Sequence, residues 1–343
     1  MHHKATIADI AKELNTTPAT VSRALNNHPR ISEETKRSVQ QAASRLNYKR
    51  NKVASSLRSG KTHLIGVIIP SAEINFFGSV VHGIESVANL QGYNVLLYQS
   101  NESRESEEKG LESFLSARVD GILISIAKDT MDYSHLQQIK SRGVPIVFFD
   151  RANDDLGIDS VVIDDYKGAF LATQHLIAQG YRRIAHIAGP QHLKNFYDRL
   201  KGYLGALQAH KIKPDPSLIY HGNVSIDSGR EGARFLLAQG NKPDAIFAAE
   251  DFTALGVISA LKEQGIRMPE QVGVIGFANE LFGEHITPRL STVDQQTIQM
   301  GRSALELLVE LIGKKESGGH RQQKVVLEPL LICRDSSVRL GGT

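Results

Sequence analysis

Residues 6–57 read TIADIAKELNTTPATVSRALNNHPRISEETKRSVQQAASRLNYKRNKVASSL. Three helical patterns follow one another here, and each begins at a residue suited to cap a helix, namely Thr6, Thr17 and Ser32. Pro18 suits the first turn of the second helix, because its missing N–H needs no partner there. Two short helices joined by a tight turn and braced by a third are typical of a helix-turn-helix.

The second helix has a polar outer face. Its apolar residues Val21, Ala24 and Leu25 fall on one side, which leaves Thr20, Ser22, Arg23 and Asn26 outside. Small hydroxyl side chains allow a close approach to a DNA groove, and an arginine can reach guanine. The pattern therefore indicates DNA binding, although a small helical bundle with a solvated polar face would share it.

Charge is unevenly distributed along the chain. Residues 1–61 contain twelve Lys/Arg and four Asp/Glu, a net charge of +8, whereas the remaining residues carry a net charge of −5. A basic head on a mildly acidic body is typical of a nucleic-acid module attached to another domain.

The segment after the third helix is basic around a small apolar face. Val53, Ala54 and Leu57 would share that face if the segment became helical. Leu57 could then insert between base steps in the minor groove. The alternative is a basic linker in which Leu57 has no special role.

From residue 63 onward, strand-like runs alternate with helical ones, which predicts parallel sheets covered on both faces, with about five strands in each of two sheets. The predicted strands are residues 63–70, 93–100, 119–126, 144–150, 182–189, 244–250 and 272–278. The predicted helices lie near residues 77–91, 105–117, 165–179, 196–210, 228–239, 251–264 and 295–313.

Ligands bind beyond the carboxyl ends of such strands or in a cleft between two such domains. Several polar and aromatic residues lie there: Phe76, Phe77, Asp150, Arg151, Asp164, Asp165, Arg199, Glu250, Asp251, Asn279 and Glu280. Aromatic faces with carboxylates, amides and an arginine suit a hydroxyl-rich ligand such as a sugar. Each residue could equally be a helix cap or a surface charge.

Several other classes of protein lack support in the sequence. The chain contains no apolar run of membrane-spanning length and no apolar signal region after Met1, so we expect a cytoplasmic protein. No glycine-rich phosphate loop, nucleophile elbow or metal-ligand spacing appears, so we expect no enzyme, cofactor or metal site. The apolar surroundings of Cys333 predict a buried, inert thiol.

The chain as a whole resembles the lactose-repressor/purine-repressor (LacI) family of bacterial transcription regulators. The head carries the most specific match, and others are NKVASSLRSG (51–60), HLIGVIIP (63–70), ARVDGILI (117–124), GYRRIAHIAGP (180–190), RLKGY (199–203), AAEDFTALG (248–256) and TPRLSTVDQ (287–295).

The resemblance implies a helix-turn-helix head over residues 1–49, a hinge helix over 50–61 and an effector-binding and dimerisation body over 62–343. The body would consist of two doubly wound, parallel-sheet lobes like those of periplasmic binding proteins. The first lobe would comprise residues 62–164 and 295–324, and the second residues 165–294 and 325–343.

The resemblance also assigns site residues. DNA contacts would fall to Thr6, Thr17, Pro18, Ala19, Thr20, Ser22, Arg23, Asn26, Asn51, Ala54, Leu57 and Arg58. Effector contacts would fall to Phe76, Phe77, Ser125, Asp150, Arg199, Glu250, Asn279 and Gln295.

Two departures from the family pattern matter. Arg50 stands where the family has a proline before the hinge. Ala278 stands where many members have an effector-binding aspartate, a role that Asn279 or Glu280 could take over.

The implied function is that of a dimeric repressor. Two heads would bind a pseudo-palindromic operator, and a small effector, expected to be a sugar or a sugar derivative, would bind between the lobes and change DNA affinity. The body alone would also fit a solute-binding protein or a Rossmann-like enzyme.

Overall fold

The computed structural model describes residues 5–48, 61–314 and 321–339. The chain forms two compact units, residues 1–62 (the head) and residues 63–343 (the body). The predicted hinge residues Asn51, Ala54, Leu57 and Arg58 lie outside the described residues.

The described residues of the head form three helices, α1 (Ile7–Glu13), α2 (Pro18–Leu25) and α3 (Glu33–Arg45). All three predicted caps are confirmed, because the side chains of Thr6, Thr17 and Ser32 each accept a hydrogen bond from the backbone N–H three residues later. The buried residues that the helices share form a small apolar core of Ile10, Ala11, Val21, Ala24, Val39 and Ala42.

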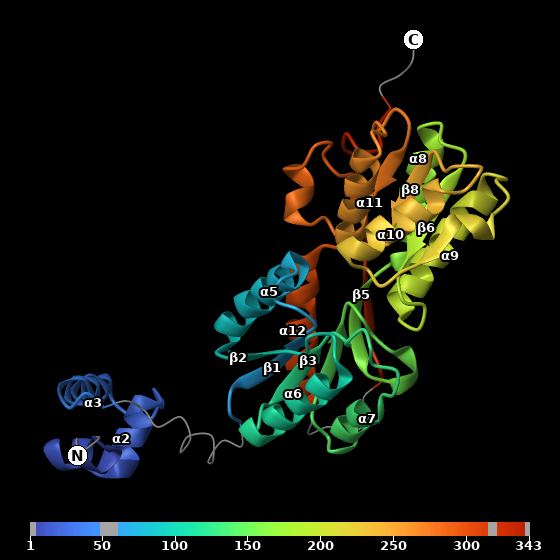
Figure 1. The fold of residues 1–343 in the computed structure, drawn as a ribbon. Coiled ribbons are helices and arrows are strands. Elements are labelled where there is room, and N and C mark those ends of the chain that lie inside the picture. Colours follow the sequence, from blue (N-terminus) through green and yellow to red (C-terminus); the bar gives the residue numbers. More distant parts are fainter. Residues whose placement is uncertain (1–4, 49–60, 315–320, 340–343) are drawn as a thin grey trace. The chain divides into compact units, whose positions relative to one another are not determined.

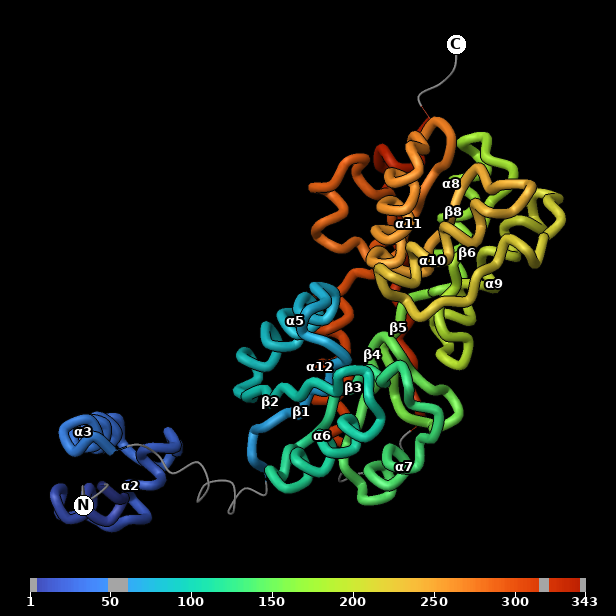
Figure 2. Tube along the Cα trace, viewed as in Figure 1, coloured from blue at the N-terminus to red at the C-terminus, as the bar shows by residue number. Residues whose placement is uncertain are grey.

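The first lobe of the body is built on a six-stranded parallel sheet of order β11-β5-β4-β3-β1-β2. Its strands are β1 (Leu64–Ile69), β2 (Asn94–Gln99), β3 (Gly121–Ile124), β4 (Ile146–Phe149), β5 (Asp159–Ile163) and β11 (Lys324–Leu327). Its helices are α5 (Asn75–Gln91), α6 (Arg104–Ala117), α7 (Ser134–Ser141) and α12 (Thr297–Lys314), with a 3-10 turn η1 (Asp154–Leu156). Figures 1 and 2 show these helices around the sheet.

Alternate strand residues of the first lobe enter two different apolar cores. Val67 and Leu123 belong to the core shared with α5 and α12, whereas Ile68 and Ile122 belong to the core shared with α6 and α7. This alternation follows from the pleat, which points successive side chains to opposite faces. The sheet is therefore covered on both faces, as predicted.

The second lobe has a four-stranded parallel sheet of order β7-β6-β8-β9. Its strands are β6 (Ile184–Ala188), β7 (Ile219–His221), β8 (Ala245–Ala248) and β9 (Gly273–Ile275). Its helices are α8 (Asp165–Ala178), α9 (Lys194–Ala209), α10 (Ile226–Leu237) and α11 (Asp251–Glu263), with 3-10 turns η2 (Pro216–Leu218) and η3 (Leu281–Glu284). An antiparallel pair, β10 (Thr292–Asp294) and β12 (Leu330–Ile332), completes the lobe.

The structure corrects three expectations. Residues 325–327, which we assigned to the second lobe, pair with β5 in the first sheet, so the last crossing between the lobes follows Leu327. The two main sheets have six and four strands rather than about five each. Cys333 is exposed rather than buried, because it lies directly after β12 of a two-stranded sheet. The part of its side chain that is covered raises the pKa of the thiol.

Helices α5 and α12 cross at a pair of glycines. A Cβ atom at Gly301 of α12 would overlap the carbonyl oxygen of Val80 in α5, and one at Gly83 of α5 would overlap the carbonyl oxygen of Ile298 in α12. The two backbones can approach this closely only because both positions lack a side chain.

Gly301→Ala is expected to lower the free energy of unfolding by about 1–3 kcal/mol, because a backbone carbonyl in a packed helix cannot move aside as a side-chain tip can. Gly313 of the same helix has no atom within 4 Å of an added Cβ, so Gly313→Ala should leave stability unchanged or raise it. Urea unfolding of both variants checks this pair. Equal destabilisation by the two alanines would refute the crossing argument.

Candidate functional site

The exposed face of α2 carries most of the residues expected to contact DNA. Val21 and Ala24 are buried in the head core, which turns the opposite side of the helix to solvent. Thr17, Pro18, Ala19, Arg23 and Asn26 are exposed, and Thr20 and Ser22 are partly buried. The hydroxyls of Thr17 and Thr20 lie 3.0 Å apart at the start of the helix. This end of α2 therefore presents small polar side chains, as an approach to a groove requires.

Thr6 has a structural role in the head. Its side chain and backbone form a reciprocal capping box with Asp9, in which Thr6 N donates to Oδ2 of Asp9 at 2.8 Å. The sequence pattern of a cap is thereby confirmed, whereas contact of Thr6 with DNA stays a prediction.

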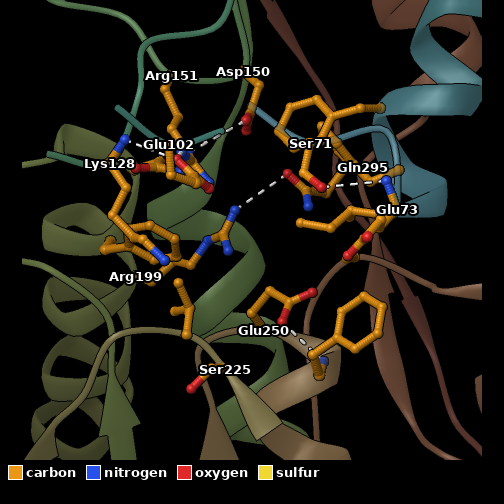
Figure 3. Close-up of a pocket in the computed structure, with 18 of the residues that line it drawn as sticks. Ser71, Glu73, Glu102, Lys128, Asp150, Arg151, Arg199, Ser225, Glu250 and Gln295 are labelled. Atoms are coloured by element: carbon orange, nitrogen blue, oxygen red, sulfur yellow. Dashed lines mark hydrogen bonds and ion pairs between the residues drawn. The ribbon is translucent and has the colours of Figure 1, made fainter. Parts of the chain in front are cut away.

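A cavity of about 390 Å³ lies between the two lobes of the body. We call it the interlobe cavity, and Figure 3 shows the residues of its walls. Residues of the first lobe and of the returning segment line one side, among them Ser71, Glu73, Ile74, Phe76, Phe77, Glu102, Lys128, Asp150, Arg151 and Gln295. Residues of the second lobe line the other, namely Asn195, Phe196, Arg199, Val224, Ser225, Ile226, Glu250, Phe252 and Ala278.

The strand-end rule explains the position of several of these residues. Asp150 directly follows β4, Glu250 follows β8 after one intervening residue, and Gln295 directly follows β10. Six of the eight predicted effector residues line the cavity: Phe76, Phe77, Asp150, Arg199, Glu250 and Gln295.

The other two predicted residues, Ser125 and Asn279, are not among the residues that line the cavity. The hydroxyl of Ser125 is buried and donates to Oδ2 of Asp150 at 3.2 Å. The amide of Asn279 donates to Oδ2 of Asp294 at 2.9 Å and accepts from Nη2 of Arg334 at 2.9 Å. Both side chains thus support the wall from behind.

Arg199 is a large and almost fully buried side chain of the cavity, with 2% of its surface exposed. Its Nε donates to Oδ1 of Asp165 at 2.8 Å, its Nη1 to the carbonyl of Ala249 at 2.7 Å and its Nη2 to Oε1 of Gln295 at 3.2 Å. The guanidinium carbon also lies 3.8 Å from the centre of the Phe277 ring. Arg199 therefore links α8, β8 and the segment after β10 at the junction of the lobes.

A second guanidinium pairs within the first lobe. Arg151 donates through Nη1 to Oε2 of Glu102 at 2.6 Å and through Nη2 to Oε1 at 3.1 Å. Sequence reasoning placed Arg151 at a strand end but missed Glu102. Glu102 follows β2 by three residues, so the same rule could have found it.

Lys128, Asn195, Phe196 and Phe252 were also missed. They lie on the loop after β3 and on the first turns of α9 and α11, where a sequence does not say which side a residue faces.

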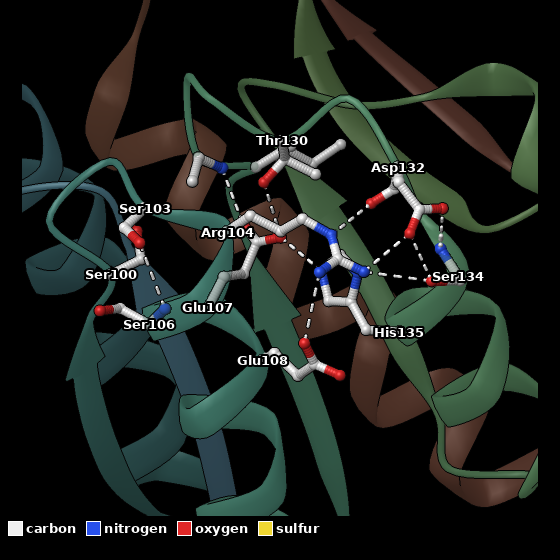
Figure 4. A network of polar contacts seen from close by, with 12 residues as sticks. Ser100, Ser103, Arg104, Ser106, Glu107, Glu108, Thr130, Asp132, Ser134 and His135 are labelled. Atoms are coloured by element: carbon white, nitrogen blue, oxygen red, sulfur yellow. Dashed lines mark hydrogen bonds and ion pairs between the residues drawn. The ribbon is translucent and has the colours of Figure 1, made fainter.

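A buried polar network holds the loop that carries Lys128. The fully buried carboxylate of Glu107 accepts hydrogen bonds from the N–H of Ala127 at 2.6 Å, from the hydroxyl of Thr130 at 3.2 Å and from Nε2 of His135 at 2.7 Å (Figure 4). The carbonyl of Lys128 then lies 2.7 Å from Nε2 of His192 in the second lobe. The network thereby fixes one of the contacts between the lobes.

The carboxyl groups of Glu250, Asp251 and Glu280 lie close together at the second-lobe wall of the cavity. Burial and the neighbouring charges of Asp251 and Glu280 raise the pKa of Glu250 well above its usual value. Burial also raises the pKa of Asp251 to about 7, against the lowering effect of hydrogen bonds from the N–H of Glu280 and the hydroxyl of Thr292.

The raised pKa of Asp251 predicts a pH-dependent stability. Because the folded chain holds this proton more tightly than the unfolded chain does, the stabilisation is complete at low pH and is lost as the pH rises through about 7. Between the pKa of the unfolded chain, near 4, and about 7 the loss amounts to roughly 1.4 kcal/mol per pH unit, and above that range both states are ionised and the loss is complete.

The contribution of Asp251 is therefore expected to lower the melting temperature between pH 4 and pH 7, and this decrease should be absent in Asp251→Asn. The asparagine can accept from the N–H of Glu280 and donate to the hydroxyl of Thr292, which lie at the two carboxylate oxygens of Asp251. Identical pH profiles for the parent and the variant would show that Asp251 does not titrate in this range.

The described residues offer neither a metal-binding cluster nor a membrane-spanning helix. In the part of the chain that the structure describes, no three His, Cys, Asp or Glu side chains are grouped to hold a metal ion. None of the described helices combines the length and the apolar character needed to cross a bilayer.

Comparisons with known proteins agree with this arrangement. Residues 6–51 match the model for bacterial regulatory proteins of the lacI family, and residues 173–337 match that for a periplasmic binding protein-like domain. The HTH-type transcriptional repressor PurR of Haemophilus influenzae (strain PittEE) is 33% identical over 337 residues, which cover 97% of this chain and 98% of that protein.

Solved structures are similar along the whole chain. The lac repressor dimer bound to operator and the anti-inducer ONPF has a TM-score of 0.86 at 26% identity, covering 98% of this chain and 100% of that one. The transcriptional regulator CelR in complex with cellobiose has a TM-score of 0.73 at 30% identity, covering 97% of this chain and 100% of that one. The family resemblance and the predicted fold class are confirmed: the chain belongs to the lacI family of bacterial regulatory proteins, as a DNA-binding transcriptional regulator with an effector-binding domain.

Proposed function

We propose that the protein is a repressor that binds a pseudo-palindromic operator as a homodimer and is controlled by an uncharged carbohydrate. The observation that carries the proposal is the interlobe cavity, whose walls come from both lobes, in a chain whose head exposes a polar helix. A ligand that contacts both lobes favours one arrangement of them over another, and so can change the population that binds DNA.

The head supports the DNA part of the proposal. The capped start of α2 exposes Thr17, Pro18 and Ala19, and Arg23 follows one and a half turns later. Residues 1–61 carry a net charge of +8, which suits a polyanionic partner. We propose that Asn51, Ala54, Leu57 and Arg58 contribute minor-groove and backbone contacts, as the family resemblance implies.

The cavity supports an uncharged, hydroxyl-rich effector. Phe76, Phe77, Phe196 and Phe252 offer aromatic surfaces, Asp150 offers a buried carboxyl group, and Glu250 offers a partly buried one. All three guanidinium nitrogens of Arg199 already donate to protein oxygens, and Arg151 is paired with Glu102. Neither guanidinium is thus without a carboxyl partner, which leaves little unpaired positive charge for an acidic ligand, whereas hydroxyls can hydrogen-bond with the carboxyl groups of Asp150 and Glu250.

Two other functions fit parts of the chain less well. A solute-binding protein would have no use for the basic head, and a Rossmann-like enzyme would need a nucleophile, metal set or phosphate loop that the sequence does not provide. We therefore propose a non-catalytic regulator that acts in the cytoplasm, where bacterial chromosomal DNA lies.

A thermal-shift screen of neutral mono- and disaccharides, sugar acids, sugar phosphates and purines tests the effector class. We expect a neutral sugar to raise the melting temperature, because a ligand that binds only the folded state stabilises it. A shift confined to acids, phosphates or purines would contradict the carbohydrate proposal.

Selection of duplexes from a random DNA pool, followed by gel shifts with and without the stabilising sugar, tests the switch. A two-fold symmetric consensus bound by two copies is expected, with affinity lowered by the sugar. The absence of a consensus sequence at moderate salt would contradict operator binding. Turnover of any screened compound would support the alternative of an enzyme.

A further inference from the structure

The start of α5 is completed by a residue of the other lobe. The residue before the helix, Ile74, makes no side-chain cap, so the first backbone N–H groups of α5 need a partner from elsewhere. Oε1 of Glu280 accepts the N–H of Phe76 at 3.0 Å. Glu280 belongs to the second lobe, 204 positions along the chain from Phe76.

Glu280 is held firmly in its own lobe. Its N–H donates to Oδ2 of Asp251 at 2.8 Å, and its carbonyl accepts from the N–H of Gly283 at 2.9 Å. Only 2% of its surface is exposed. The carboxylate is therefore fixed relative to the second-lobe wall of the cavity.

An unusual backbone brings Glu280 to this position. Ala278 has φ 138° and Asn279 has φ 58°, both in the region that favours glycine. Two successive residues of this kind are costly and persist only where surrounding contacts hold them. Here the N–H of Ala278 donates to the carbonyl of Val293 at 2.9 Å, and the N–H of Asn279 donates to Oγ1 of Thr292 at 3.1 Å.

The hydrogen bond to Glu280 lies next to two residues of the cavity wall. Phe76 and Phe77 both line the interlobe cavity, and their rings meet edge to face with centres 5.0 Å apart. They lie in the first turn of α5, where the N–H of Phe76 donates its hydrogen bond to Glu280. Glu280 itself is not among the residues that line the cavity.

We propose that Glu280 is a positioning residue for effector binding: from the second lobe it holds the first turn of α5, and so sets the position of the two phenylalanines over the cavity. A carboxylate at a helix N-terminus is stabilised by the unpaired N–H groups and the helix dipole. Because one lobe supplies the carboxylate and the other the helix, the contact depends on the arrangement of the two lobes. This inference rests on the proposed function for its biological meaning, but the contact can be tested without any ligand.

The inference also accounts for the departure at Ala278. The carboxylate that the family resemblance implies at this position is absent, and Ala278 leaves that part of the cavity wall apolar. The carboxylate two residues later does not replace it against the effector, because it is directed at the backbone of α5.

Hydrogen–deuterium exchange of the full-length protein, without effector or DNA, tests the contact. Glu280→Ala is expected to speed exchange of the amides of residues 75–80 roughly tenfold or more, since it removes a buried, charge-assisted acceptor. Glu280→Gln keeps an uncharged acceptor, so its exchange should lie between those of the parent and the alanine variant. The matched control is Glu284→Ala, whose carboxylate pairs with Arg334 within the second lobe and should leave residues 75–80 unchanged.

Exchange of the amides in α12 is the internal reference for folding. Faster exchange at residues 75–80 with unchanged exchange in α12 supports the positioning role, and rescue by glutamine separates it from a simple loss of packing. Parent-like exchange at residues 75–80 in Glu280→Ala would overturn the proposal. A sugar screen without a hit would count against the proposed effector class but would not alter this result.

Discussion

Arg199→Ala is expected to lower the free energy of unfolding by about 3–5 kcal/mol and to abolish the response to sugar while operator binding persists. The stability loss follows from what Arg199 leaves behind. Asp165 would keep a buried carboxyl group without its ion-pair partner, and the carbonyl of Ala249 and the amide of Gln295 would lose a donor. Burial already raises the pKa of Asp165 to about 7 even with Arg199 acting to lower it.

The loss of response follows from where Arg199 lies. Its three nitrogens join α8, the end of β8 and the segment that returns to the first lobe, so the residue couples both walls of the interlobe cavity. Urea unfolding measures the first effect, and gel shifts with increasing sugar measure the second. The head forms a separate compact unit with its own core, which is why DNA binding should survive.

A double-mutant cycle separates charge from shape. Asp165→Asn removes the buried charge, so Arg199→Ala should cost less in that background than in the parent. Arg199→Lys keeps a positive charge but cannot make the three divergent bonds, so it should restore part of the stability and little of the sugar response. A normal sugar response in Arg199→Ala would show that the residue is purely structural.

Features that depend on near neighbours in the chain could be predicted from the sequence, whereas contacts between distant segments could not. Helix caps such as Thr17 depend on neighbours three residues away, so the sequence predicted them correctly. The strand-end rule found Asp150 and Glu250 because they lie one and two residues beyond the carboxyl ends of the parallel strands β4 and β8.

Residues whose roles depend on distant partners could not be placed. Asn279 follows a strand too, but Arg334 and Asp294 draw its amide away from the cavity. Glu280 was considered as an effector ligand, yet its partner is the backbone of Phe76 in the other lobe. Neither contact has a sequence signal, because each joins segments that only the folded body brings together.

Arg23→Ala is expected to weaken binding to the selected operator by roughly 10- to 100-fold, about 1–3 kcal/mol, and to relax the preference at one base pair in each half-site. Arg23 is exposed on α2, on the side opposite the buried Val21 and Ala24. Its guanidinium can donate two hydrogen bonds to the O6 and N7 atoms of a guanine, which no other base offers in the major groove. Fluorescence anisotropy with the operator and its single-base variants measures both effects.

The control is Arg37→Ala, which removes the same charge from an exposed position on α3. Because loss of a phosphate contact acts on all sequences alike, Arg37→Ala should lower affinity for operator and random DNA by the same factor. Arg23→Ala should instead bring the operator and its single-base variants closer together in affinity. If both variants lose affinity for operator and for random DNA by the same factor, Arg23 contacts only the phosphate backbone. Base recognition then lies with the hydroxyl and methyl groups at the start of α2.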